Sequence, residues 1–369
     1  MGTHSAASAA SRRFHGVRAW TIPFIGVAVI AAPLLQASAA RASVHHDTST
    51  ASLLAQGKKF YKGKTITIIA PDAPGGGFDE YARAVAPVVA TYLHAQVIVS
   101  NIAPANTITG QDAFNAAKPD GLTVGMINPG SDIQDQVTNV PGVNFNPLRL
   151  AFLGASGGGP VEFGCLASSP YKSMTQVIQS TSPVSEIVVT KGSQTVQLRL
   201  LNAAFGFPAQ VITGYTSTHA EVQGFERGDG NCSVLGIADL GSFIAAGKSS
   251  ILFRTAPVAK GTAFAGEQAN AALLSTLAKK FPAKTNRERL ARAAIVTLGN
   301  IGHEFNLQTK VSEDRVLAMR AAIQFALTNK TVQSNLLAEG NEIGFISGVQ
   351  AKADYVSEYT NLKRVASII

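Results

Sequence analysis

The sequence predicts an α/β protein of two lobes, and three observations support this fold class. The chain has 369 residues, which is more than one ordinary domain contains. Strand-forming runs alternate with helical patterns, as they do around parallel sheets. A glycine-rich stretch over residues 154–160 separates two such series and is interpreted as the crossing between lobes. We expect residues 58–155 and 286–369 to form the first lobe and residues 156–285 the second.

The N-terminal region has the pattern of an export signal. Arginines at positions 12, 13 and 18 precede an apolar stretch over residues 19–35, and small residues follow up to Ala40. An uncleaved membrane anchor is the alternative, which the short, proline-interrupted stretch disfavours. We expect a signal peptide over residues 1–42, cleaved near Ala40, and a periplasmic or otherwise extracytoplasmic protein. The Arg-Arg pair is too short a pattern to fix the export route. Residues 43–57 are expected to form a flexible linker.

The first series of elements begins directly after this linker. Strands are predicted at residues 65–70, 96–100 and 122–127, and helices at residues 78–93 and 109–117. In the first helix, apolar residues from Tyr81 to Val89 recur near helical spacing. Pro87 is expected to bend or shorten that helix.

The second series follows the glycine-rich stretch. Strands are predicted at residues 161–166, 186–190, 211–213, 232–237 and 251–253, and helices at 173–181, 194–204 and 220–227. From about residue 268 to the end, the sequence predicts a helical region.

Two late helices carry start signals. Ser312 followed by acids suits a helix start, and Ser347 with Gln350 forms a capping-box pattern. The apolar stripes predicted to be buried are Val316, Met319, Ile323 and Leu327 in the first helix, and Val349, Ala353, Val356 and Tyr359 in the second.

The strongest functional signal is the loop Pro74-Gly75-Gly76-Gly77-Phe78-Asp79, in which a strand ends, three glycines follow and a helix begins. Glycines allow tight turns and close approach to a ligand. A helix start presents free N–H groups and a positive partial charge, which suits a carboxylate or phosphate. Asp79 either favours the helix dipole, holds the loop in shape or contacts a ligand.

Other chemistries lack their motifs. The loop has neither the Gly-Lys-Ser/Thr of a P-loop nor the spacing of a dinucleotide fingerprint. Residues 154–158 match Gly-x-Ser-x-Gly, but a strand rather than a helix is predicted after Ser156. His219 and His303 are in no recognisable triad setting, and no zinc motif is present. We therefore expect no enzyme activity, no metal and no cofactor.

Charge and cysteine content narrow the class further. Four of the eight net positive charges come from arginines in the signal segment, and no dense basic run follows. Nucleic-acid binding is therefore not expected. Cys165 and Cys232 either pair, as exported cysteines often do, or remain two separate buried thiols.

Three segments resemble the substrate-binding receptors of tripartite tricarboxylate transporters, also called Bug receptors. The first runs from Phe60-Tyr61-Lys62-Gly63-Lys64 through the glycine loop to Ala82-Arg83. The second combines Val97-Ile98-Val99-Ser100-Asn101 with Pro119-Asp120-Gly121-Leu122-Thr123. The third, a looser match, combines Val211-Ile212-Thr213-Gly214-Tyr215 with Ile237-Ala238-Asp239-Leu240. The chain departs from the family pattern at residues 103–110 and at Thr216, where the family has a lysine.

The resemblance implies a periplasmic-binding-protein fold, type II-like, in which two α/β lobes enclose a ligand cleft. It also implies a small carboxylate ligand and partners in the small and large membrane subunits of the transporter. Carried onto this chain, the family's ligand-binding positions are Pro74, Gly75, Gly76, Gly77, Phe78, Asp79, Asn128, Pro129, Gly130, Ser131, Ser193, Gln194, Thr195, Tyr215 and Asp239. Ser193 has the alternative of capping its helix, and Tyr215 that of packing.

The expected mechanism is hinge closure, in which the first lobe captures the carboxylate and the second closes over it. We expect a monomeric receptor for a di- or tricarboxylate or a related organic acid. A periplasmic metabolite sensor that uses the same cleft is the alternative, and an exported enzyme is the third possibility.

Overall fold

The computed structural model describes residues 49–102, 107–127, 129–190, 192–257, 266, 271–298 and 301–369. Residues Thr50–Ile369 form one compact unit. The expected signal peptide, its cleavage at Ala40 and the first part of the linker lie outside the described residues. Residues 49–61 are helical, so the prediction of a flexible linker is wrong over 49–57. This helix packs closely on a later one, because a Cβ on Gly57 would lie 2.0 Å from the carbonyl oxygen of Asp314.

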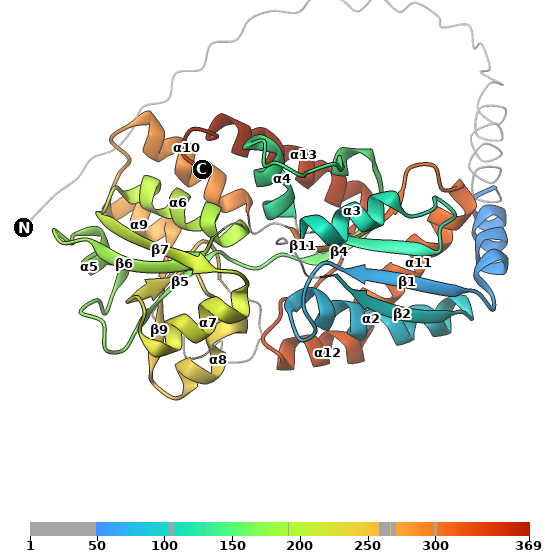
Figure 1. Cartoon of the computed structure of the whole chain (residues 1–369), viewed down its shortest axis with the longest axis horizontal. Coiled ribbons are helices and arrows are strands. Elements are labelled where there is room, and N and C mark those ends of the chain that lie inside the picture. The colour runs from blue at the N-terminus through green and yellow to red at the C-terminus, as the bar shows by residue number, and fades with distance from the viewer. Residues whose placement is uncertain are drawn as a thin grey trace, which may run out of the picture. The chain divides into compact units, whose positions relative to one another are not determined.

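Sheet A has the strand order β12-β4-β11-β3-β1-β2. Its strands are β1 Thr65–Ala70, β2 Gln96–Asn101, β3 Thr123–Ile127, β4 Leu150–Gly157, β11 Ile301–Gln308 and β12 Ile346–Ser347. Its helices are α2 Gly77–Leu93, α3 Ile108–Ala116, α4 Pro129–Val137, α11 Glu313–Leu327, α12 Lys330–Ala338 and α13 Gly348–Arg364. α2 and α12 cover one face, and α3 lies on the other (Figure 1). α2 continues through Pro87 and is not shortened there.

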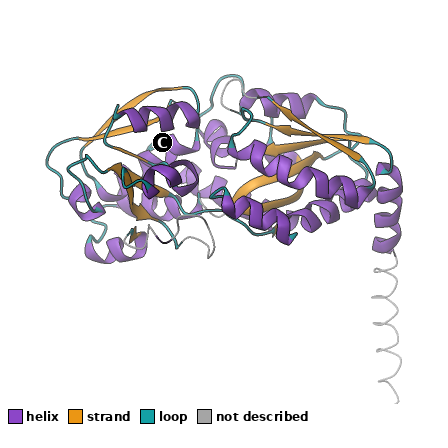
Figure 2. Ribbon diagram, turned by 90° about the horizontal axis from the view of Figure 1, so that it is seen from below, coloured by secondary structure: helices purple, strands orange, loops and turns teal. Residues whose placement is uncertain are grey.

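Sheet B has the order β10-β9-β5-β8-β6-β7. Its strands are β5 Glu162–Leu166, β6 Val184–Val189, β7 Ala209–Tyr215, β8 Cys232–Ser233, β9 Ser249–Arg254 and β10 Ala272–Leu273. Its helices are α5 Met174–Ile178, α6 Ser193–Phe205, α7 Thr218–Arg227, α8 Ile237–Ala245, α9 Leu274–Lys280 and α10 Asn286–Thr297. A 3-10 turn, Pro147–Arg149, precedes β4. Figure 2 shows helices packed against the strands of both sheets.

Both sheets are mixed, which corrects the prediction of parallel sheets. β11 is antiparallel to both β3 and β4, and β5 is antiparallel to β8 and β9. The helical region predicted from residue 268 onward is interrupted by β10, β11 and β12. The predicted crossing at 154–160 begins inside β4, and the predicted strand 232–237 ends at Ser233.

A buried polar layer lies along β11, a strand that we did not predict although polar and apolar residues alternate over residues 304–308. Glu304 and Asn306 have no solvent exposure, and neither have Phe305 and Leu307 between them, so both faces of the strand are buried. Facing this layer are Asp132 of α4 and Tyr355 and Glu358 of α13, each at most 1% exposed. Burial raises the pKa of Asp132 and of Glu304, and it raises the pKa of Glu358 to about 8.

The two late helices differ in how well their buried faces were predicted. The stripe on α11 is buried as expected. On α13 the prediction is wrong, because Val349 is 77% and Val356 44% exposed. α13 instead packs through Ala351, Tyr355 and Leu362. A polar residue, Glu358, lies on this buried face, and that hides the face from a hydrophobicity pattern.

One hydrophobic cluster includes residues of both sheets. It contains Phe152 of β4 and Phe163 of β5, with Tyr355 and Leu362 of α13. α10, which we expected in the first lobe, contacts α6 of sheet B, where Arg292 Nε donates to the Ala204 carbonyl at 2.9 Å. The two sheets are therefore joined by a shared helical layer.

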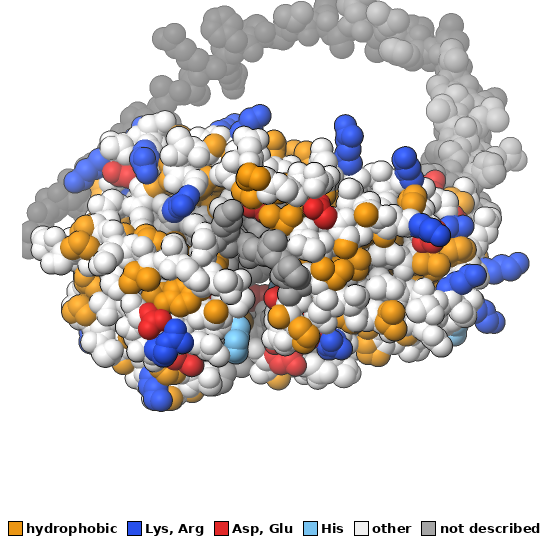
Figure 3. Space-filling view, in the orientation of Figure 1, with side chains coloured by type: hydrophobic (Ala, Val, Ile, Leu, Met, Phe, Trp, Pro, Cys, Tyr) orange, Lys and Arg blue, Asp and Glu red, His pale blue; other side chains and the backbone are white. Residues whose placement is uncertain are grey.

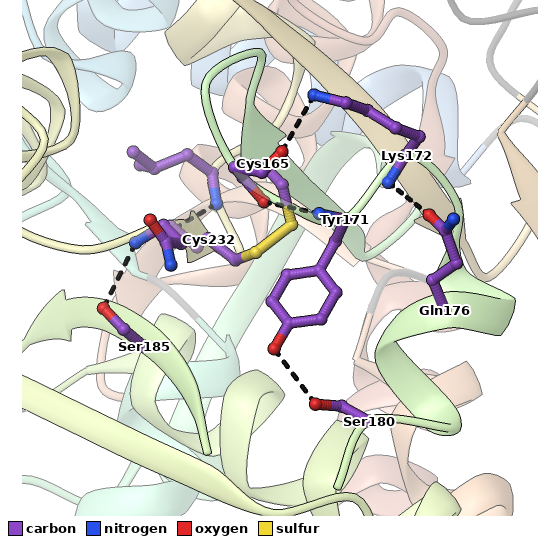
Figure 4. The surroundings of a disulfide bond; sticks show 11 residues. Cys165, Tyr171, Lys172, Gln176, Ser180, Ser185 and Cys232 are labelled. Atoms are coloured by element: carbon purple, nitrogen blue, oxygen red, sulfur yellow. Dashed lines mark hydrogen bonds between the residues drawn. A yellow bond between two sulfur atoms is a disulfide. The ribbon is translucent and has the colours of Figure 1, made fainter. Parts of the chain in front are cut away.

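Cys165 and Cys232 form a disulfide (Figure 4). They are directly opposed in the antiparallel pairing of β5 with β8, a relation that their separation of 67 positions does not reveal. Tyr171 lies beside the bridge, and its hydroxyl is 3.0 Å from Ser180 Oγ. The bridge fixes the short β8 to β5 in the middle of sheet B.

Candidate functional site

The glycine loop forms a tight turn into α2, as predicted. Gly75 has φ +81°, a conformation that L side chains rarely adopt. Gly76 is the N-cap of α2 and supplies no capping side chain. No atom lies within 4 Å of the position that a Cβ on Gly75 would take. The turn therefore leaves one side of the helix start open.

Asp79 holds this loop in shape. It is 4% exposed, and its carboxylate accepts hydrogen bonds from the Gly75 amide at 2.9 Å, Arg83 Nε at 2.8 Å and Asn101 Nδ2 at 2.9 Å. Burial alone would raise the pKa of Asp79, but these three donors outweigh it, and the pKa is lowered. Of the three roles that the sequence leaves open for Asp79, the geometry favours that of holding the glycine loop in shape.

The other side of the loop is closed by Asp72. A Cβ on Gly76 would lie 2.0 Å from Asp72 Oδ2, so a larger residue at this position would displace the Asp72 carboxylate. Asp72 accepts from the Ala73 amide at 2.8 Å. Its pKa is raised by burial, against which the amides of Ala73 and Phe78 act. A carboxylate of the chain itself is thus already placed beside the helix start.

His303 is a site residue that the sequence analysis missed. Its ring stacks on Tyr81 with centroids 4.2 Å apart and meets Phe78 edge-on at 4.4 Å. Its Nε2 is 3.2 Å from the Cβ position of Gly77. Burial lowers the pKa of His303 to about 4, so the imidazole is neutral at neutral pH. The polar and apolar alternation over residues 304–308 could have identified β11 as a strand, but no local pattern places His303 beside α2.

The predicted second loop is the start of a helix. Pro129, Gly130 and Ser131 form the first turn of α4, and Ser131 Oγ accepts a hydrogen bond from the Ser193 amide at 3.1 Å. The starts of α4 and α6 therefore meet. Asn128 lies outside the described residues. The sequence Pro129-Gly130 suggested a loop. Proline is nevertheless common at the first position of a helix, which is where Pro129 lies in α4.

The predicted residues of α6 are engaged within the fold. Thr195 is buried, and its hydroxyl donates to the Val189 carbonyl at 2.7 Å. Gln194 Nε2 donates to Thr218 Oγ1 at 2.9 Å. Both side chains therefore connect α6 to other parts of sheet B and its helices.

Tyr215 is the last residue of β7, and Asp239 lies in the first turn of α8. The Tyr215 hydroxyl donates to Asp229 at 2.9 Å, and its ring lies against Gly224 of α7, which is the packing alternative. Asp239 is an exposed residue at the start of α8, where it accepts from the Gly236 amide at 3.2 Å.

A second contact joins the two sheet systems near α8. Gly340 has φ +86°, and a Cβ there would lie 3.1 Å from the Ala238 Cα. The same loop is bound to α2, since Asn341 Nδ2 donates to Glu80 at 2.7 Å and the Tyr81 hydroxyl donates to the Glu342 carbonyl. On the face drawn in Figure 3, lysine and arginine side chains lie mostly toward the margins of the molecule, and some acidic side chains lie nearer its middle.

Among the described residues, no group of three or more His, Cys, Asp or Glu side chains is placed to hold a metal ion. In the same part of the chain, no helix is long and apolar enough to cross a membrane.

Comparisons with known proteins identify the fold. No protein-family model matches the chain. No curated protein matches it either. MatC from Rhodopseudomonas palustris with bound malate is 16% identical at a TM-score of 0.63, covering 82% of this chain and 99% of that chain. Rpa4515 from R. palustris with adipate is 14% identical at 0.65, covering 83% and 97%. The periplasmic binding protein BugD is 16% identical at 0.64, covering 84% and 99%. The predicted two-lobed periplasmic-binding-protein fold is thereby confirmed.

Proposed function

We propose that the protein is an extracytoplasmic solute-binding receptor of the Bug type. It captures a small carboxylate, such as a di- or tricarboxylate or a related organic acid, and delivers it to the small and large membrane subunits of a tripartite transporter. The single observation that carries the proposal is the start of α2, where the N-cap Gly76 supplies no capping side chain and open space lies beside Gly75.

The chemistry of this helix start suits a carboxylate. The first N–H groups of a helix have no partner within the helix, and the dipole favours negative charge there. Asp72 shows that a carboxylate fits against one side of the loop. On the side of Gly75 and Gly77, the surroundings are open space and the neutral ring of His303. The ligand's carboxylate would bind on that side.

The ligands bound in the similar structures support the proposal. Two of the three structures compared above were solved with malate or adipate, which are both dicarboxylates. Closure would bring the starts of α6 and α8 over the ligand, and the contacts Ser131–Ser193 and Gly340–Ala238 mark where the two sheet systems meet.

A thermal-shift screen tests the proposal. The purified protein is heated with mono-, di- and tricarboxylates, amino acids and aromatic acids. A ligand that binds only the folded state adds about 2.7 kcal/mol to the free energy of unfolding when its concentration is a hundred times its Kd, and the melting temperature rises accordingly. Stabilisation by one class of acid supports the receptor and names its substrate class. Absence of stabilisation by every acid contradicts the carboxylate proposal.

A further inference from the structure

Basic side chains gather at the end of sheet A where β1 begins. Four lysines lie within residues 58–64, which are too few for a dense basic run in the sequence. The fold brings two further segments beside them, because the Tyr61 hydroxyl donates to the Gly121 carbonyl at 3.0 Å and to the Arg315 carbonyl at 3.3 Å. We call the surface formed by residues 49–64, 117–122 and 309–315 the basic end.

The basic end has an excess of positive charge. Its acids are Asp120, Glu313 and Asp314, and its bases are Lys58, Lys59, Lys62, Lys64, Lys118, Lys310 and Arg315. All of these lysines except Lys58 are exposed. The two salt bridges found in the described part of the chain lie elsewhere, on α2 and at the end of α7. In Figure 3, lysine and arginine side chains stand out on the right, where Figure 1 shows the N-terminal helix in blue. These charges therefore face solvent, where they attract an anionic surface.

Aromatic rings lie among these charges. Lys58 Nζ is 3.8 Å from the centroid of the Tyr92 ring, and the Tyr92 and Phe325 rings have centroids 5.1 Å apart. Phe325 is 48% exposed. Arg315 Cζ is 3.6 Å from the centroid of the Phe60 ring. Exposed rings bordered by cations match the boundary of a lipid bilayer, where rings enter the edge of the acyl region and cations meet the head-group phosphates.

The preceding sequence favours a membrane as the partner. The apolar stretch over residues 19–35 ends shortly before the helix at residues 49–61. In the precursor that the export-signal pattern predicts, this stretch enters a membrane. The basic end contains the first folded residues that follow it along the chain. An exported chain meets phospholipid rather than nucleic acid, so the charges fit a lipid surface better than a nucleic-acid backbone.

The basic end and the glycine loop lie at opposite ends of β1. The strand has six residues, from Thr65 to Ala70, and is about 20 Å long. The glycine loop follows its far end. A membrane that contacts the basic end therefore leaves the start of α2 uncovered.

We propose that the basic end binds a membrane surface that contains anionic phospholipid. The exposed lysines meet the head-group phosphates, and Phe325 enters the boundary between head groups and acyl chains. Attachment is reversible, because each lysine contributes little by itself and salt screens its charge. For a receptor that delivers its ligand to a membrane transporter, such attachment keeps the protein close to that membrane.

Vesicle flotation tests the proposal. The form used is residues 41–369, which contain the compact unit Thr50–Ile369 and omit the apolar stretch. It is mixed with vesicles of phosphatidylcholine, with or without phosphatidylglycerol, at low and at high salt. The protein should float with the anionic vesicles only, and high salt should release it.

Charge variants locate the binding surface. The triple variant Lys59→Gln, Lys62→Gln and Lys64→Gln should bind the anionic vesicles about tenfold more weakly or worse. The control variant Lys284→Gln, Lys352→Gln and Lys363→Gln removes the same charge from exposed positions elsewhere and should bind like the parent. Phe325→Ala should weaken binding while leaving its salt dependence unchanged. Melting temperatures establish that each variant is folded.

The outcomes distinguish lipid from other partners. Absence of flotation with anionic vesicles, or equal flotation with neutral ones, overturns the proposal. Equal losses in both triple variants would show that net charge rather than the basic end binds the vesicles, and would overturn it too. Retention on heparin without flotation would identify an acidic macromolecule in place of lipid. The ligand found in the screen should have the same Kd in both triple variants, so a failure here leaves the receptor proposal standing.

Discussion

The amide of Gly75 donates a 2.9 Å hydrogen bond to the carboxylate of Asp79 four residues later. One side chain in the first turn of α2 thus sets the conformation of the loop that precedes it. Arg83 and Asn101 hold that side chain in turn, so the loop is positioned by residues that need not touch a ligand. This arrangement leads to the first two predictions.

Asp79→Asn should weaken ligand binding by about tenfold or more, since a hydrogen bond to a charged group contributes about 1.5–3 kcal/mol to the structure of the loop. The neutral amide keeps the size of the side chain but loses the charge that attracts Arg83. The measurement is the Kd of the ligand found in the screen. Asp314→Asn removes an acid from the first turn of α11 and should leave the Kd unchanged. Equal losses in both variants would indicate a general effect on stability.

Gly75→Ala should lower both stability and affinity. A Cβ meets no atom there, but φ +81° is unfavourable for alanine, by about 1–2 kcal/mol. Gly142 has φ +92° and equally open surroundings, so Gly142→Ala is a control with similar strain away from the site. We expect similar falls in melting temperature and a loss of affinity for Gly75→Ala alone. Unimpaired affinity in Gly75→Ala would show that the loop conformation is not required.

His303→Phe should make the protein less sensitive to acid. The folded pKa of His303 is about 4, below the value of about 6.5 in an unfolded chain. Between these values only the unfolded chain takes up the proton, so stability falls as pH falls from about 6.5 to 4, by up to about 1.4 kcal/mol per pH unit. Phenylalanine keeps the stacking on Tyr81 without titrating. Urea unfolding across this range should give a shallower slope for the variant, and parallel curves would contradict the burial of a neutral imidazole.

Glu358→Gln should act in the opposite pH range. The folded pKa of Glu358 is about 8, raised by burial and secondly by Asp354, against an ordinary value of 4.5. The unfolded chain releases its proton first, so this group reduces stability progressively as pH rises from about 4.5 to 8. Glutamine does not ionise, and the variant should lose less stability than the parent over that interval. Parallel curves, or a steeper loss in the variant, would contradict a raised pKa of Glu358 in the folded protein.

The sequence predicts the fold where local pattern and burial agree. Strands such as β1 and β2, helices such as α2 and α11, and the turn at Gly75 follow from apolar periodicity and glycine chemistry. The α13 face was misplaced because an acid, Glu358, occupies the buried side while Val349 is exposed. α13 and β11 pack against each other through the buried polar layer around Glu304, and neither helix propensity nor strand propensity predicts such a layer.

The site was predictable only in part, because its remaining members depend on tertiary contacts. His303 reaches the α2 start from a strand more than two hundred positions later. The hydrogen bond from the Tyr215 hydroxyl to Asp229 joins β7 to the turn after α7, a contact that no local pattern predicts. The pairing of Cys165 with Cys232 depends on strand register. Each of these relations is fixed by the fold rather than by neighbouring residues.

The position of β11 between β3 and β4 has a consequence for how the chain folds. Sheet B uses strands from residues 162–273, so its segments are close in sequence. Sheet A leaves a gap between β3 and β4 that only residues 301–308 fill, after sheet B has been passed. Closing such long loops is slow. Sheet B can therefore assemble while the chain is still emerging, whereas sheet A keeps two open edges until almost the whole chain has arrived, and chaperone protection would matter most in that interval.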